Sequence, residues 1–199
     1  MDEQQRSLRL VEGYKVVLAS NSPRRKELLA GVGIDFEVRT LKNIDESWPQ
    51  NLKGEDIPVY ISSKKSEAYK PSMADDEMII TADTIVYDNG QVLGKPMDEH
   101  DAESFLRQLS GHAHEVITGV CIATKNKTVQ FASTSKVFFD ELSDEEINYY
   151  VNTYKPFDKA GAYGIQEWIG FIGVSRIEGS YFNVMGLPVQ RLYKALRQF

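Results

Sequence analysis

Cysteine is almost absent from this chain, since Cys121 is the single cysteine among 199 residues. One thiol excludes an internal disulfide and argues against a metal site built from thiolates. Long apolar runs are missing too, and none approaches the roughly 20 residues that cross a bilayer, so we expect no membrane partner. No Pro/Ser-rich linker, repeat or low-complexity tract divides the chain. We therefore expect a polar extension at residues 1–13 and a single α/β domain at residues 14–199.

Positive charge is also scarce, because 23 Lys and Arg face 29 Asp and Glu, which gives a net charge of −6. A protein that binds duplex nucleic acid needs a broad basic surface to displace counterions, so no nucleic-acid partner is expected. A small anionic ligand requires only a few well-placed cations, and a divalent metal ion can offset more of its charge. The N-terminal segment lacks the apolar core of a signal peptide, which predicts a cytoplasmic protein.

Neither familiar glycine-rich phosphate loop is present, since the chain has no Walker A string and no Gly-x-Gly-x-x-Gly after a strand. A different anion site is predicted near the N-terminus. Val16–Ala19 predicts a buried strand, Ser22 can cap the helix that follows, and Pro23 suits its first position. Arg24 and Arg25 then fall in the first turn, where cations oppose the helix dipole unless an anion lies among them. This arrangement suits a polyphosphate, although arginine pairs also occur on plain solvated helix faces.

An acidic residue, Asp83, interrupts the apolar run at residues 78–86. Burying a carboxylate without partners is costly, so Asp83 is either exposed at a strand end, as an Asx-type turn residue, or retained for chemistry. Asn89-Gly90 follows between apolar runs and predicts a tight hairpin. Lys95 comes just after this hairpin, and by itself it would be taken for a surface lysine.

Helix and strand signals alternate along the rest of the chain. Asp98 predicts a helix start, and a capping box at Ser143–Glu146 predicts another, whose tyrosines are expected to pack rather than to stack on a ligand. His112 and His114 fit no familiar zinc spacing, so we expect them in a turn and a strand rather than on a metal. The other predicted elements are strands at 35–39, 116–123, 128–139 and 171–177, and helices at 56–69, 98–109 and the C-terminal end.

Six short blocks occur in an order that covers about residues 16–196. They are Leu-Ala-Ser-Asn-Ser-Pro-Arg-Arg at 18–25, Ala-Asp-Thr at 82–84, Gly-Lys-Pro at 94–96, Leu-Ser-Gly at 109–111 with His114, Asp-Lys-Ala-Gly-Ala-Tyr-Gly-Ile-Gln at 158–166, and Gly-Ser-Tyr at 179–181 leading to Gly-Leu-Pro at 186–188. Together they resemble the Maf family of nucleoside triphosphate pyrophosphatases. One such block could arise by chance, but an ordered set along nearly the whole chain identifies the family.

The resemblance implies a fold and a reaction. The Maf family has an elongated α/β fold similar to that of inosine triphosphate pyrophosphatases, with a mixed sheet flanked by helices and two lobes around a central cleft. Its members cleave a nucleoside triphosphate between the α and β phosphorus atoms, giving a nucleoside monophosphate and pyrophosphate. We therefore expect a nucleotide substrate, a divalent metal cation (Mg²⁺ or Mn²⁺) and a homodimer.

The motif match also implies roles for individual residues. Asp83 would be the general base that activates water, and Glu46 a carboxylate associated with the metal. The residues expected to contact phosphates are Ser20, Arg24, Arg25, Lys65 and Lys95. The family usually has Lys-Ala in the helix before the hairpin, whereas this chain has Ser-Ser-Lys-Lys-Ser at 62–66. Lys65 is the better match, and Lys64 could substitute for it.

Three positions resemble the subgroup that acts on dTTP and UTP: Arg24 after Ser-Pro, Thr84 after the aspartate, and Gln166 after Gly-Ile. A glutamine amide offers a donor and an acceptor together, which matches the imide edge of uracil or thymine. The resemblance thus implies a house-cleaning pyrophosphatase for dTTP and UTP, and for modified pyrimidine nucleotides such as 5-methyl-UTP and pseudo-UTP. The alternatives are 7-methyl-GTP or another purine triphosphate as the substrate, and a nucleotide-sensing regulator of cell division.

Overall fold

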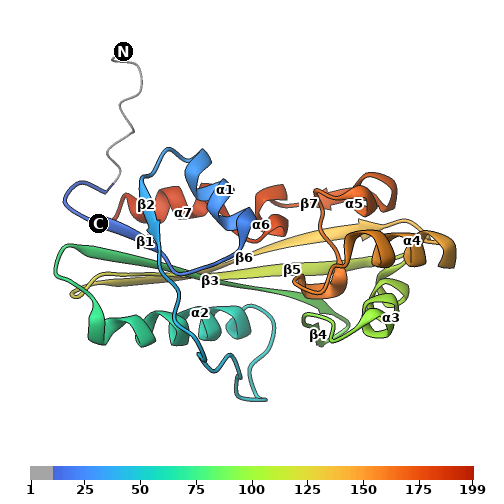
Figure 1. Cartoon of the computed structure of the whole chain (residues 1–199), viewed down its shortest axis with the longest axis horizontal. Helices are drawn as coiled ribbons and strands as arrows, with labels where there is room; N and C mark the ends of the chain where they lie inside the picture. The colour runs from blue at the N-terminus through green and yellow to red at the C-terminus, as the bar shows by residue number, and fades with distance from the viewer. Residues whose placement is uncertain (1–10) are drawn as a thin grey trace, which may run out of the picture. The chain divides into compact units, whose positions relative to one another are not determined.

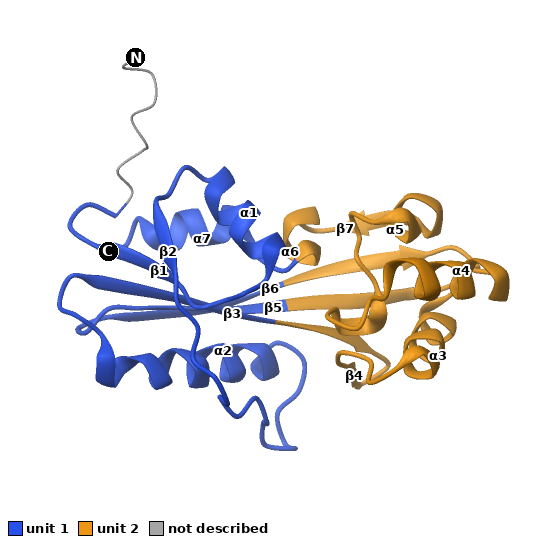
Figure 2. Ribbon diagram, in the orientation of Figure 1, with its two compact units in different colours: residues 1–83, 118–133, 186–199 blue, residues 84–117, 134–185 orange. Residues whose placement is uncertain are grey.

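The computed structural model describes residues 11–199, which fall into two compact units (Figure 2). Unit 1 contains the residues up to 83 together with 118–133 and 186–199, and unit 2 contains 84–117 and 134–185. Three long strands each contribute to both units: β3 (Glu77–Asp88), β5 (Ala113–Ala123) and β6 (Thr128–Phe139). Of the predicted N-terminal extension, residues 1–10 lie outside the described part, and residues 11–13 form a turn.

A mixed seven-stranded sheet is the framework of the fold (Figure 1). The other strands are β1 (Lys15–Leu18), β2 (Phe36–Val38), β4 (Gln91–Leu93) and β7 (Val174–Glu178). The strand order is β2-β1-β3-β5-β6-β7, with β4 paired to β3. Strand β1 runs parallel to β2 and β3, whereas the β3–β4 and β6–β7 pairs are antiparallel. The predicted α/β fold with a mixed sheet is therefore confirmed.

Helices cover both faces of the strands in unit 1. They are α1 (Pro23–Gly31), α2 (Asp56–Tyr69), which continues into a 3₁₀ turn at Lys70–Ser72, and α7 (Val189–Leu196). Figure 1 shows α1 and α7 on one face of these strands and α2 on the opposite face. A strand covered on both sides is apolar at consecutive positions, which explains why Val16, Val17 and Leu18 are all buried.

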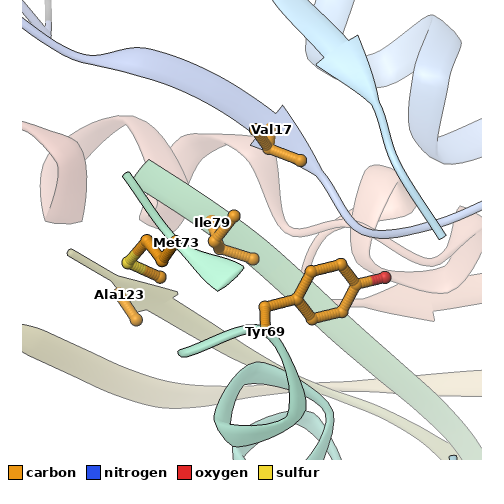
Figure 3. Close-up of a cluster of buried hydrophobic side chains, with 5 residues drawn as sticks. All are labelled: Val17, Tyr69, Met73, Ile79 and Ala123. Atoms are coloured by element: carbon orange, nitrogen blue, oxygen red, sulfur yellow. The ribbon is translucent and has the colours of Figure 1, made fainter. Parts of the chain in front are cut away.

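A cluster of buried side chains joins α2 and the turn after it to the sheet (Figure 3). Its members are Val17, Tyr69, Met73, Ile79 and Ala123. The Tyr69 hydroxyl also accepts a hydrogen bond from the Leu41 amide and donates one to the Arg39 carbonyl, each at 3.0 Å. Ile44 packs against the cluster. The apolar core therefore anchors the loop after β2, which carries Glu46.

Local sequence signals correctly predict two helix starts and one hairpin in unit 2. Its helices are α3 (Glu99–Leu109), α4 (Asp144–Tyr154), α5 (Trp168–Gly173) and α6 (Tyr181–Met185), with a 3₁₀ turn at Ala160–Ala162. Asp98 caps α3, and Ser143 and Glu146 form the reciprocal capping box of α4. Asn89 and Gly90 have φ values of 48° and 84°, as the hairpin between β3 and β4 requires. Among the helices of residues 11–199, none has the length and apolar character of a membrane span.

The strand predicted at residues 171–177 is wrong in its first half. Trp168–Gly173 forms α5, and only the residues from Val174 onward form β7. A short apolar run without alternation does not distinguish a strand from a helix. A Cβ atom on Gly170 would overlap the Ile165 carbonyl. The first part of α5 therefore lies close to the preceding loop, and this approach requires a glycine.

Helix α2 lies against β5 at a glycine. A Cβ atom on Gly119 would overlap backbone atoms of Pro58 and Val59 in the first turn of α2. These are backbone atoms, so a side-chain rotation cannot relieve the overlap. The distance between α2 and the sheet is therefore set by the absence of a side chain at this position.

We predict that Gly119→Ala lowers the free energy of unfolding by about 1–3 kcal/mol or more, because α2 must move away from β5. Urea denaturation followed by circular dichroism measures the change. Gly31→Ala is the matched control, since nothing lies within 4 Å of a Cβ atom there, and its effect should stay under about 1 kcal/mol. Equal effects of the two substitutions would contradict a close contact at Gly119.

The two histidines lie where the sequence predicts, His112 in the turn before β5 and His114 in the strand itself. His114 is 2% exposed, and its Nε2 lies 2.7 Å from the Tyr163 hydroxyl. Burial lowers the pKa of His114 to about 4; the charge of His112 acts in the same direction, and that of Asp88 opposes it. The ring is therefore neutral in the folded protein near pH 7.

This burial predicts a loss of stability in mild acid. Below pH 6.5 the unfolded chain protonates His114, whereas the folded chain does not until about pH 4. The unfolded state thus binds more protons in that window, and His114 lowers the free energy of unfolding by about 2 kcal/mol between pH 7 and pH 5. Urea denaturation at both pH values should show this drop in the wild type and a smaller one in His114→Gln. The same drop in both proteins would contradict it.

Candidate active site

The turn between β1 and α1 has the geometry that the sequence predicts for an anion site. The Ser22 hydroxyl accepts a hydrogen bond from the Arg25 amide at 3.4 Å, and Pro23 lies in the first turn of α1. The Ser20 hydroxyl accepts one from the Ser22 amide at 3.2 Å. No acidic residue lies in the first turn. The positive end of the helix dipole and the side chain of Arg24 therefore lie together at this turn.

Arg25 holds backbone groups as well as supplying charge. Its Nε donates to the Gly186 carbonyl at 2.8 Å, and its Nη1 donates to the Ala82 carbonyl at 2.9 Å. Burial lowers the pKa of the Arg25 guanidinium from its ordinary value, while the nearby Asp83 and Glu46 act in the opposite direction. Arg25 thus ties α1 to β3 directly beside Asp83. The sequence predicted only a phosphate contact for Arg25, and the structure adds this positioning role.

Asp83 lies inside the 12-residue strand β3, so the alternative of an Asx-type turn residue is wrong. Its side chain is 13% exposed. Alternate residues of a strand point to the same face, and Asp83 therefore shares a face with Thr81. The Thr81 hydroxyl donates to the Ser62 carbonyl of α2 at 2.7 Å. Asp83 accordingly points toward the side of the sheet that α2 covers.

Lys65 lies about one turn after Ser62 on α2 and bridges two carboxylates. Its Nζ is 2.8 Å from Asp83 Oδ1 and 3.1 Å from Glu46 Oε1. The lysine side chain is 14% exposed, so its charge compensates Asp83 in a partly desolvated setting. Within residues 11–199, Lys65 is the hydrogen-bond partner of the Asp83 carboxylate, and it contacts Oδ1. The Oδ2 atom takes no part in this contact.

The neighbouring Lys64 has a different partner. Its Nζ lies 2.6 Å from Asp45 Oδ2 and 3.3 Å from the Ser47 carbonyl. The hydrogen bonds from Lys64 and from Ser47 hold the pKa of the Asp45 carboxyl below its usual value. This contact fastens the loop next to Glu46. The sequence left Lys64 open as a substitute for Lys65, and the structure places Lys65 at Asp83.

Two carboxylates lie beside Lys65 in unit 1, those of Glu46 and Asp83. One oxygen of each carboxylate contacts the ammonium group of Lys65, so the two carboxylates already share one cation. Carboxylate oxygens are the ligands that Mg²⁺ and Mn²⁺ prefer. The donor set therefore fits a hard divalent cation.

A second acidic group lies at the start of α3 in unit 2. In the part of the chain that the structure describes, Asp98, His100 and Asp101 place three donor atoms within 4.8 Å of one another. Asp98 already caps α3, and Asp101 accepts a hydrogen bond from the Met97 amide at 3.2 Å. These bonds account for the cluster as a helix cap, so we assign it no metal.

Three predicted substrate-binding residues lie in unit 2. Thr84 follows Asp83 in β3 and is half-buried, Lys95 is exposed, and Gln166 is half-buried. The Gln166 Oε1 atom is buried, and among the described residues it has no hydrogen-bond partner. A buried amide oxygen without a partner carries a desolvation cost, which a ligand with a donor group would remove.

One backbone hydrogen bond joins the loops that carry Lys95 and Gln166. The Gly161 amide donates to the Gly94 carbonyl at 3.0 Å. Gly161 has a φ of 67°, and a Cβ atom there would lie 2.7 Å from Val86 Cγ2. Both the left-handed backbone and the lack of space require glycine at this position. The loop of Gln166 is therefore built on the segment that precedes Lys95.

Sequence reasoning missed the charged pair beside this loop. Lys159 is 8% exposed, and its Nζ lies 3.1 Å from Glu167 Oε1. The signal was present in the sequence, because a lysine and a glutamate stand at the two ends of a loop made mostly of small residues. The distance between them in the sequence did not indicate that they form an ion pair.

Known proteins resemble this chain over nearly its whole length. The sequence model of the Maf-like protein family matches residues 15–199. A dTTP/UTP pyrophosphatase of Parabacteroides distasonis is 61% identical over 186 residues, which are 94% of this chain and 96% of that protein. Proteins of the same name from Phocaeicola vulgatus and Bacteroides fragilis are 61% and 55% identical, with 94% of this chain and 97% of each relative covered.

A solved structure of low sequence identity has a similar fold. The Ham1 protein of Staphylococcus aureus has a TM-score of 0.50 and 15% identity, and the alignment covers 92% of this chain and 98% of that one. At this identity the likeness concerns the fold alone. The family match and the relatives extend over nearly the whole length, and on that basis the chain belongs to the Maf-like protein family.

Proposed function

We propose that this protein is an enzyme that hydrolyses dTTP and UTP to the nucleoside monophosphate and pyrophosphate. The observation that carries the proposal is the Lys65 bridge, which holds Asp83 and Glu46 together beside Arg25. The substrate is supported by relatives named dTTP/UTP pyrophosphatases that cover 94% of the chain. By the family resemblance the proposal extends to residues 14–199 as one functional domain, to a homodimer in the cytoplasm, and to Mg²⁺ or Mn²⁺ as the cation.

In the proposed mechanism Asp83 is the general base. Its Oδ2 atom accepts a proton from water as the water oxygen attacks the α phosphorus. The bond from that phosphorus to the oxygen bridging to the β phosphorus then breaks, and pyrophosphate leaves. Lys65 holds the carboxylate in position through Oδ1. Proton transfer to a positioned base accounts for rate enhancements of about 10²–10⁴-fold.

Cations stabilise the negative charge that develops on the phosphates. Arg24, Ser20 and the backbone amides at the start of α1 supply contacts at the helix N-terminus, with Arg25 beside them and Lys95 in unit 2. A divalent cation, when bound, supplies further positive charge to the triphosphate. Glu46 would hold that cation through its carboxylate oxygens.

Recognition of the base is assigned to Gln166, with Thr84. The imide edge of uracil or thymine presents one N–H donor and carbonyl acceptors, and a glutamine amide matches both. The buried Oε1 atom of Gln166, without a partner among residues 11–199, supports this assignment. It would accept the hydrogen bond from the imide N–H of the base.

We predict that the pair of Lys65 and Asp83 is essential for turnover. Asp83→Asn removes the proton acceptor, and Lys65→Ala removes the group that positions it, so kcat for dTTP with Mg²⁺ should fall by about 10²–10⁴-fold in each. Lys64→Ala is the matched control on the same helix, because Lys64 contacts Asp45 instead, and its kcat should change less than about threefold. Pyrophosphate release measures all three. Full activity in Asp83→Asn would remove Asp83 from the base role.

We predict that Gln166→Leu weakens the preference for uracil and thymine, which have an imide edge, over cytosine, which has none. The loss of one paired donor and acceptor corresponds to about 1–3 kcal/mol, or roughly 5- to 150-fold in the ratio of kcat/KM between UTP and CTP. A pyrophosphate-release panel of dTTP, UTP, CTP, GTP and 7-methyl-GTP measures it on both proteins. Wild-type preference for GTP or 7-methyl-GTP would contradict the pyrimidine assignment. Binding of dTTP without product would favour a nucleotide sensor.

A further inference from the structure

The loop that carries Gln166 has a backbone that the rest of unit 2 must hold in place. Gly161 and Ala162 are both left-handed, with φ values of 67° and 59°. For Ala162 this conformation is strained, because it has a Cβ atom. Strained residues persist only where surrounding contacts fix them, and they gather at functional sites. The contacts around residues 159–167 therefore hold this strained backbone in place.

Tyr150 of α4 fixes the loop from one side. The Gly164 amide donates to the Tyr150 hydroxyl at 3.0 Å, and the hydroxyl donates in turn to Glu167 Oε2. Tyr150 is 0% exposed. Burial and the bond to Glu167 raise the pKa of Tyr150 above its ordinary value, so the hydroxyl keeps its proton. One hydroxyl group thus holds the loop at two points on either side of Gln166.

Lys159 and Glu167 close the loop at its two ends. Lys159 Nζ lies 3.1 Å from Glu167 Oε1 and 2.7 Å from Asp158 Oδ1. The loop packs tightly over this pair, because a Cβ atom on Gly164 would lie 2.8 Å from Glu167 Cδ and 3.1 Å from Lys159 Cε. Each oxygen of the Glu167 carboxylate therefore has its own partner, the hydroxyl of Tyr150 or the ammonium of Lys159.

Gln166 lies between these fixed points in the sequence. Its neighbour Glu167 is anchored through the side chain, and Gly164 is anchored through the backbone amide. The backbone of Gln166 consequently has little freedom to turn. A fixed backbone limits the positions that the Gln166 amide can reach. The position of the amide decides whether it pairs better with an imide edge, as in uracil, or with the amidine edge of cytosine.

We propose that Tyr150, Glu167 and Lys159 are positioning residues that set base selectivity by fixing the backbone on either side of Gln166. This inference rests on the proposed function, since it assigns selectivity to Gln166. It goes beyond that function by naming residues that need no contact with the nucleotide. Because Asp83 and Lys65 belong to the other unit, the positioning residues should affect binding and selectivity rather than the rate of the chemical step.

The test is Tyr150→Phe, which removes only the hydroxyl. We expect KM for dTTP and UTP to rise about tenfold, kcat to change less than threefold, and the UTP to CTP ratio of kcat/KM to fall at least fivefold. Tyr154→Phe is the matched control: Tyr154 lies on the same helix and its ring stacks on Tyr150 at 5.1 Å, but it is partly exposed. Glu167→Gln provides a second variant, which keeps an acceptor for Tyr150 and removes the charge that Lys159 contacts.

Hydrogen–deuterium exchange gives a readout that does not depend on turnover. Amides of residues 159–168 should exchange at least tenfold faster in Tyr150→Phe than in wild type or Tyr154→Phe, while α4 itself keeps its protection. Unchanged exchange in this segment overturns the proposal. Faster exchange with an unchanged UTP to CTP ratio overturns it as well, because the residues would then be structural only.

The two proposals fail in different ways. If the wild type releases no pyrophosphate from dTTP or UTP, the proposed function is wrong, and the exchange measurement still decides whether Tyr150 fixes the loop. If the wild type is active and selective but Tyr150→Phe and Glu167→Gln keep its selectivity, only the positioning role is wrong. If Tyr150→Phe does not fold, Glu167→Gln becomes the test. It must then show the same fall in the UTP to CTP ratio and the same faster exchange of residues 159–168, and the absence of either overturns the proposal.

Discussion

A carboxylate on a central strand needs a cation beside it. In unit 1 this need fixes where α2 lies against the sheet. Asp83 follows a run of buried apolar residues on β3, where an uncompensated charge would cost several kcal/mol. Lys65 compensates it, but only because α2 lies against the sheet at a fixed distance and register. Gly119 permits the approach, and the hydrogen bond from Thr81 to Ser62 sets the register. The placement of one charge thus depends on a glycine in β5 and a hydroxyl in β3.

A second helix, α1, also binds β3 next to Asp83. Arg25 of α1 binds the carbonyl of Ala82, one residue before Asp83, while Lys65 of α2 binds the Asp83 side chain. Two cations therefore meet at consecutive residues of a protein whose net charge is −6. This is how an acidic protein offers a positive site: the charge is concentrated by packing rather than spread over the surface. Arg25 and Lys65 also hold helices against β3 through hydrogen bonds. Removing either positive charge should therefore also weaken the packing of this segment.

Local signals account for the part of the fold and the site that the sequence predicted. Ser22, Asp98 and Ser143 each cap the helix expected of them, and Asn89-Gly90 forms the expected hairpin. Such features depend on the chemistry of a few adjacent residues, which a sequence displays directly. The family resemblance, rather than local chemistry, pointed to Lys65 and Glu46.

The features that the sequence did not predict depend on residues far apart in the chain. The second half of α5, Phe171–Gly173, was expected as part of a strand, because the close contact of Gly170 with the Ile165 carbonyl is not visible in the sequence pattern. The hydroxyl of Tyr150 was expected merely to pack, since nothing near it in the sequence shows that Gly164 and Glu167 lie beside it. Asp83 remained open between a turn and a site for the same reason, as its partner is on α2.

The regular geometry of β3 determines where the side chains of Asp83 and Thr84 point. Asp83 and Thr84 are consecutive in a regular strand, so their side chains point to opposite faces of the sheet. Asp83 points toward the face that α2 covers, and Thr84 points away from it. The two side chains therefore leave β3 on different faces, and we expect them to make separate contacts. The proposed recognition of the base by Gln166 rests on its buried Oε1 atom, which has no partner among residues 11–199, and on the contacts that fix its loop.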